Sequence, residues 1–108
     1  MEAPASGACF AAEATAANRQ LVDGQTVWLE REASDRAGDA LLRDVWVADP
    51  SGNLALVAAR LLEAGAGTAA PVPPDTRYQG WLAGAAETAQ ANGAGLWGAC
   101  PQSTPAGA

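Results

Sequence analysis

The chain has 108 residues, enough for one domain of a size that gains noticeably from a cross-link, because small domains bury a smaller share of their surface. Its net charge is −6, and all its basic residues are arginines spread along the chain. An acidic balance opposes binding to nucleic acid, where basic side chains displace counterions from phosphate. The absence of histidine excludes histidine metal sites and histidine general bases.

The first half of the chain predicts a helix followed by two strands. Residues 8–22 are rich in alanine and lack proline, which favours a helix that ends at Gly24. Residues 26–31 alternate between two faces, as strands do, and the polar residues 32–40 predict a loop. Residues 41–48 are rich in strand-forming side chains and predict a second strand.

The second half predicts a turn and two helices. The composition of residues 49–53 is typical of a turn, and apolar residues recur at helical spacing over 54–64. The proline-containing residues 68–77 predict an extended connection, which leads to a helix over 78–92. Residues 101–108 predict a disordered tail or linker. The expected class is α+β, and two strands alone need further strands or helix cover to make a stable sheet.

Several strings in this order resemble one family, the staphylococcal-nuclease-like (thermonuclease) domains. The helix over 78–92 is followed by Gly-Leu-Trp at 95–97 and then by Cys100, as the family ends its domain. Residues 12–27 resemble the family's first helix, and 41–47 resemble the strand after its catalytic loop. The resemblance covers roughly residues 1–100.

The resemblance implies an oligonucleotide-binding-type (OB-fold) β-barrel of five strands with three helices. In active members it implies hydrolysis of DNA or RNA phosphodiesters with calcium. The family's first three strands precede the first helix, and Glu2-Ala3-Pro4 resembles the Asp-x-Pro turn that ends the third strand. We therefore expect a partial barrel over residues 1–100 with few strands, lacking the first three.

The catalytic groups that the resemblance implies are largely missing. One metal-binding carboxylate and one arginine belong to the absent strands, and the second carboxylate falls on Glu2, a candidate calcium ligand. The water-activating glutamate falls on Ala5, and the second catalytic arginine falls on Ala40 or Asp39. Arg36 lies close in sequence and would replace that arginine only through a shifted loop. Each such loss lowers the rate by orders of magnitude.

Cys9 and Cys100 lie near opposite ends of the chain, without the close spacing of a metal site. From their number alone, two free thiols in a reducing compartment and one disulfide are equally simple. The resemblance favours a disulfide, since some exported family members carry cysteines in these places. A disulfide favours an extracellular or cell-surface setting. Residues 1–4 lack the features of a signal peptide, so we expect any such signal to lie outside this chain, and no apolar run is long enough to span a membrane.

The resemblance leaves two functions open. The first is a non-catalytic or impaired nuclease-like domain that serves as a binding or structural module and needs no cofactor. The alternative is a calcium-dependent nuclease completed by upstream strands or a partner chain, although added strands cannot restore the groups missing at Ala5 and at Ala40 or Asp39. A partial barrel would expose an apolar sheet face and an open edge. We therefore expect a homo-oligomer or a partner protein that completes the barrel, and we do not expect nucleic acid as a ligand.

Overall fold

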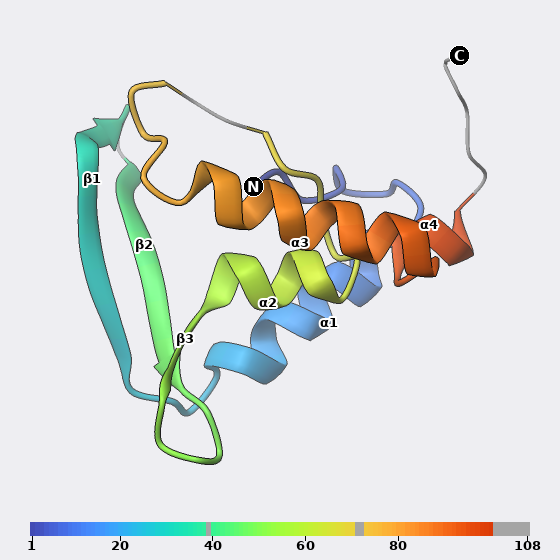
Figure 1. Ribbon diagram of the computed structural model, residues 1–108, viewed down its shortest axis with the longest axis horizontal. Helices are drawn as coiled ribbons and strands as arrows, with labels where there is room; N and C mark the ends of the chain where they lie inside the picture. Colours follow the sequence, from blue (N-terminus) through green and yellow to red (C-terminus); the bar gives the residue numbers. More distant parts are fainter. Residues whose placement is uncertain (39, 71–72, 101–108) are drawn as a thin grey trace.

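The computed structural model describes residues 1–38, 40–70 and 73–100. Its elements in chain order are α1 (Ala11–Val22), β1 (Val27–Ala37), β2 (Ala40–Ala48), β3 (Leu54–Leu56), α2 (Val57–Glu63), α3 (Gln79–Asn92) and α4 (Leu96–Ala99). The strands form an antiparallel sheet in the order β1-β2-β3 at one end of the molecule, and the helices occupy the other end (Figure 1). The α+β class is confirmed, and the arrangement is consistent with the expected OB-like fold. The tail expected at 101–108 lies outside the described residues.

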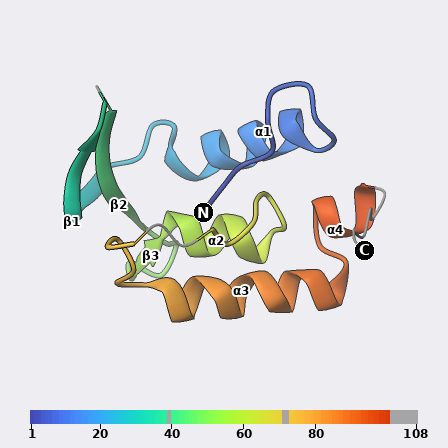
Figure 2. The same cartoon turned by 90° about the horizontal axis from the view of Figure 1, so that it is seen from above.

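The two faces of the β1–β2 hairpin meet different helices. Val27 lies opposite Val47, and Trp28 lies opposite Trp46, so alternate residues of both strands share a face. Val47 belongs to the buried cluster that includes Ala14 of α1. The Trp46 ring instead contacts the start of α3. Figure 2 shows α1 on one side of α2 and α3 on the other.

The first strand is longer than its sequence predicts. Residues 32–37, expected in a loop, continue β1 to Ala37. The register shifts between Arg31 and Arg36, so that residues 32–35 lie opposite Leu42 alone. Such a bulge bends a strand and re-aims its side chains. Here Asp35 accepts a hydrogen bond from the Arg43 guanidinium at 2.7 Å, which stabilises polar residues in a strand that local pattern assigns to a loop.

A third strand stands where the sequence predicts the start of a helix. Residues 54–56 pair with β2, with Leu54 opposite Ala48 and Leu56 opposite Trp46. The helix α2 therefore begins at Val57 and not at residue 54. Leu56 is almost completely buried, so pairing with β2 and burial together outweigh the helical spacing of the leucines.

The core lies around α2, which is short but central. Leu62 is fully buried and Leu61 nearly so, and Figure 2 shows α2 between α1 and α3. At the end of α2, Gly65 has φ 70°, a conformation suited to glycine, and its carbonyl accepts a hydrogen bond from the backbone N–H of Leu96 at 2.9 Å. This contact fixes the short helix α4 against the end of α2.

Candidate functional site

The turn that resembles a metal-binding motif is held by its backbone. The N–H of Glu2 donates to the Thr68 carbonyl at 2.8 Å, and the N–H of Thr68 donates to the Glu2 carbonyl at 2.8 Å. A Cβ at Gly67 would lie 2.7 Å from the Glu2 carbonyl oxygen, so glycine permits this approach. The Glu2 side chain is exposed, and so is Ala5 further along the segment. Among residues 1–38, 40–70 and 73–100, no group of three or more His, Cys, Asp or Glu side chains is placed to hold a metal ion.

The segment where the family has its second catalytic arginine is the tip of the β1–β2 hairpin. Ala37 pairs with Ala40, and Gly38 follows with φ 60°. Asp39 lies outside the described residues. The Nε atom of Arg36, the candidate substitute, lies 3.9 Å from Asp35 Oδ2, and the Arg36 side chain is more than half exposed.

Acidic partners accompany most of the arginines. Asp35 faces three of them, with Nε of Arg31 at 3.8 Å and Nη2 of Arg43 at 2.7 Å in addition to Arg36. Arg60 lies 3.5 Å from Glu63 and 3.9 Å from Asp49. The Arg77 guanidinium lies 2.8 Å from Glu30 Oε2. These pairs reduce the positive field that a phosphate group would meet.

Glu30 is the centre of a polar and aromatic cluster that sequence reasoning did not single out. Its Oε1 accepts hydrogen bonds from the Tyr78 hydroxyl at 2.6 Å and from the Trp46 indole at 3.1 Å. These bonds, that of Tyr78 above all, lower the pKa of the Glu30 carboxyl below its ordinary value. The rings of Trp46, Tyr78 and Trp81 lie 5.6–6.0 Å apart between centroids. The cluster fastens the start of α3 to the sheet.

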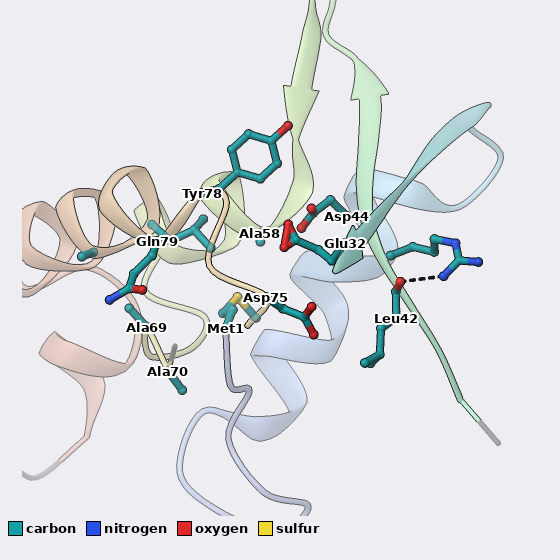
Figure 3. A pocket seen from close by; sticks show the side chains of 13 residues that line it. Met1, Glu32, Leu42, Asp44, Ala58, Ala69, Ala70, Asp75, Tyr78 and Gln79 are labelled. Atoms are coloured by element: carbon teal, nitrogen blue, oxygen red, sulfur yellow. Dashed lines mark hydrogen bonds between the residues drawn. The ribbon is translucent and has the colours of Figure 1, made fainter. Parts of the chain in front are cut away.

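A pocket of about 620 Å³ lies beside this cluster (Figure 3). Its lining is drawn from the bulged part of β1, from β2, α2 and α3, and from Ala69, Ala70 and Asp75, with Met1 also at its wall. Glu32 and Asp44 lie close together in the pocket, and Asp75 lies in the same part of the pocket wall (Figure 3). Oδ1 of Asp75 accepts the backbone N–H of Ser34 at 2.6 Å, which joins the bulge to the segment before α3.

The carboxyl groups of Glu32 and Asp44 are an unusual pair. The pKa of Asp44 is raised to about 6. Burial of its carboxyl group is the largest cause, and its interaction with Glu32 is the second. One signal of this site is visible in the sequence, since Glu30 and Glu32 alternate along β1 and Asp44 interrupts an apolar strand. The register shift that follows Arg31 was not predictable from local pattern.

The two cysteines are joined. Cys9 and Cys100 form a disulfide with their Cα atoms 5.9 Å apart, as the resemblance led us to expect. Cys9 lies just before α1 and Cys100 just after α4, so the bond ties the two ends of the described chain together.

Comparison with known protein families identifies a match, which covers most of the chain. The family model described as "Staphylococcal nuclease homologue" matches residues 2–99. The chain belongs to this family. A search of the curated proteins finds no match.

The match to the staphylococcal nuclease family runs from the Glu2 turn to the end of α4, so Cys9 lies near its start and Cys100 directly follows its end. A disulfide is compatible with an extracellular location. Within the part of the family domain that the structure describes, none of the helices has the length and apolar character needed to cross a membrane.

Proposed function

We propose that this domain is a staphylococcal-nuclease-like module without nuclease activity, which acts by binding or as a structural element. The observation that carries the proposal is the residue at position 5. The backbone bridge between Glu2 and Thr68 holds the segment that resembles the metal-binding turn. The water-activating carboxylate of the family would follow that turn, and Ala5 has no group that accepts a proton.

The charges around the sheet support the same proposal. The transition state of phosphodiester hydrolysis needs guanidinium groups free to stabilise charge on the phosphoryl oxygens. At the family's arginine position this chain has Ala40 or Asp39. Arg36 and Arg43, the nearest arginines, both lie against Asp35. With a net charge of −6, the domain is poorly suited to nucleic acid.

Incubation of the purified domain with DNA and RNA in calcium tests the lack of catalysis. No cleavage above a buffer control is the expected result. Cleavage that a chelator abolishes would support the alternative, a calcium-dependent nuclease completed by other strands.

We further propose that the binding function includes self-association through β1. Among the described strands β1 is an edge of the sheet, and Val27 and Leu29 on the same face are 38% and 59% exposed. An unpaired edge with apolar side chains is a template for pairing with another strand. Antiparallel pairing of two β1 strands about a twofold axis would extend the sheet and bring these side chains of two copies together.

Sedimentation velocity over a range of concentrations tests the association. We expect a concentration-dependent dimer that Leu29→Glu abolishes. Leu54→Glu is the matched control, because Leu54 is similarly exposed but lies on β3 at the other edge. A monomer at all concentrations, or equal effects of the two variants, would contradict association through β1.

The disulfide is in keeping with an exported or cell-surface protein, which we propose as its setting.

A further inference from the structure

The pocket beside α3 has the size and lining of a small-molecule site. Its volume of about 620 Å³ lies within the range of about 300–1,000 Å³ that is usual for ligand pockets. Much of its lining is apolar, contributed by Met1, Leu42, Ala58, Ala69, Ala70, Leu82 and Ala83. A hydrocarbon group would therefore lose water on entering it.

One wall of the pocket carries two acidic side chains, Glu32 and Asp44, that interact with each other. The Glu32 side chain is only 9% exposed, and its Oε1 has no hydrogen-bond partner. The nearest cation, Nε of Arg77, lies 3.8 Å from that oxygen, which is beyond hydrogen-bonding distance. Oδ2 of Asp44 is also buried, and the hydrogen bond between the Asp44 and Glu32 carboxyl groups requires a proton on one of them. Once that proton is lost, two neighbouring carboxylates repel each other, so above pH 6 this wall favours a cation that donates hydrogen bonds.

The neighbouring charges leave the pocket negative. Arg43 also lines it, but its guanidinium donates to Asp35 Oδ1 at 2.7 Å and to the carbonyls of Asp35 and Leu42 at 3.1 and 2.8 Å. Arg77 donates to the Arg31 carbonyl at 2.9 Å and forms its closest ion pair with Glu30. Asp75 adds a third acid to the lining.

We propose that this pocket binds a small organic cation, an ammonium group on a hydrocarbon body. The ammonium group lies against Glu32 and Asp44 in the pocket wall and takes the place of the proton that the two carboxyl groups share. The hydrocarbon lies against Leu42, Ala58 and Leu82. An ammonium group suits the site because it offers several donors in a compact charge, whereas calcium requires 6–8 oxygen ligands.

The proton on Asp44 is the competitor of this cation. Burial, Glu32 and the more distant Glu30 raise the pKa of Asp44 to about 6, while Arg77 opposes the rise. A bound ammonium group favours the ionised carboxylate and therefore displaces this proton. Binding is expected to weaken as the pH falls below 6.

The site is independent of the proposed self-association. Asp44 lies opposite Glu30, and Glu30 contacts α3. Leu29 alternates with Glu30 and so lies on the other face of the sheet, opposite Val45. Failure of one proposal would leave the other standing.

Isothermal titration calorimetry of the intact, oxidised domain tests the proposal with n-hexylammonium, neutral n-hexanol and calcium chloride as probes. At pH 7.5 we expect saturable binding of n-hexylammonium, at least tenfold tighter than that of n-hexanol, and no calcium binding at this site. Glu32→Gln and Asp44→Asn should each weaken n-hexylammonium binding at least tenfold. Glu87→Gln, an exposed carboxylate on α3, is the matched control and should leave it unchanged.

The comparison of n-hexylammonium with n-hexanol uses only the unmodified domain, so it remains decisive if a variant fails to fold. Amide chemical shifts of Leu42, Ala58 and Ala83, which line the pocket, should change with n-hexylammonium, while that of buried Ala14 should not. No saturable binding up to about 10 mM, equal affinity for n-hexanol, or unchanged affinity in both carboxyl variants would overturn the proposal. Calcium binding that Glu32→Gln abolishes would also overturn it.

Discussion

The hydroxyl of Tyr78 donates a hydrogen bond of 2.6 Å to Glu30, and this contact joins the first residue before α3 to the middle of β1. The two residues are far apart in sequence, so the bond helps to close the fold. The Arg77 guanidinium lies against the other oxygen of the same carboxylate. The pocket lies directly beside this junction, with Tyr78 in its wall.

Tyr78→Phe should lower the melting temperature by roughly 3–5 °C at neutral pH, because the ring contacts remain while the hydroxyl is lost. The Tyr78 bond lowers the pKa of Glu30, so its stabilisation is present at neutral pH and is lost as the pH falls through that lowered pKa. The difference between the variant and the unmodified domain should therefore shrink in acid. Thermal unfolding, monitored by circular dichroism, measures this difference in melting temperature. Thr88→Ala is the control, since the Thr88 hydroxyl bonds only within α3, to the Gly84 carbonyl, and its removal should change little.

Asp44→Asn should raise the melting temperature at pH 7.5 by a few degrees. The folded state keeps the Asp44 proton up to about pH 6, while an unfolded chain releases it near the ordinary value of 3.8. The folded state therefore loses stability as the pH rises from about 4 to about 6, and the variant should lack this loss. Part of the effect is screened by solvent, because the carboxyl is only partly buried.

Asp49→Asn is the matched control for Asp44→Asn and should act in the opposite direction. Oδ1 of Asp49 accepts hydrogen bonds from the hydroxyl and backbone N–H of Ser51 and from the N–H of Asn53 at 2.7–3.0 Å. These bonds lower the pKa of Asp49. Urea unfolding at pH 7.5 should show the Asp49 variant less stable than the unmodified domain. Stabilisation by both variants would contradict the opposite roles of these carboxylates.

Removal of the disulfide should lower the free energy of unfolding by roughly 4–5 kcal/mol, because the bond closes a loop of nearly the whole chain. Urea unfolding of the double variant Cys9→Ser, Cys100→Ser measures the change. A reducing agent should destabilise the unmodified domain by a similar amount and leave the double variant unaffected. Equal stability of oxidised and reduced protein would show that the bond does not support the fold.

Substitution by alanine should have opposite effects on stability at a glycine with positive φ and at a glycine inside a helix. Gly65→Ala should destabilise the domain by more than about 1 kcal/mol, since φ is 70° and a Cβ would collide with the Ala94 carbonyl and approach Gly95 N to 2.9 Å. Gly84→Ala should stabilise it by about 0.4–1 kcal/mol, because Gly84 lies within α3 and a Cβ there meets no atom within 4 Å. Urea unfolding of the two variants side by side measures both changes.

The sequence predicted the helices better than the sheet. The alanine-rich segment before Gly24 and the segment ending at Gly93 became α1 and α3, because their propensities and stops are local signals. The extension of β1 through residues 32–37 depends on Arg43 reaching Asp35 and on Asp75 reaching the Ser34 N–H. Such contacts between distant residues leave no trace in local periodicity.

The site was predictable only in the parts that follow from the family resemblance. Cys9 and Cys100 could be paired by analogy, and Glu2, Ala5 and either Ala40 or Asp39 could be assigned to family positions. The three-stranded arrangement and the short helix α4 were not expected. The bulge in β1 could not be predicted, because its register shift depends on the β1–β2 pairing as a whole.

The measurement that tests the central claim most directly is the rate of phosphodiester cleavage by the purified domain. Single-stranded DNA, double-stranded DNA and RNA are each incubated with the domain in calcium and in chelator, and an active thermonuclease serves as the positive control. We predict that the domain gives no calcium-dependent product above the buffer blank, because the family resemblance assigns Ala5 to the place of the catalytic carboxylate and Ala40 or Asp39 to that of the catalytic arginine. Calcium-dependent cleavage that follows the domain through purification and disappears with chelator would contradict this account.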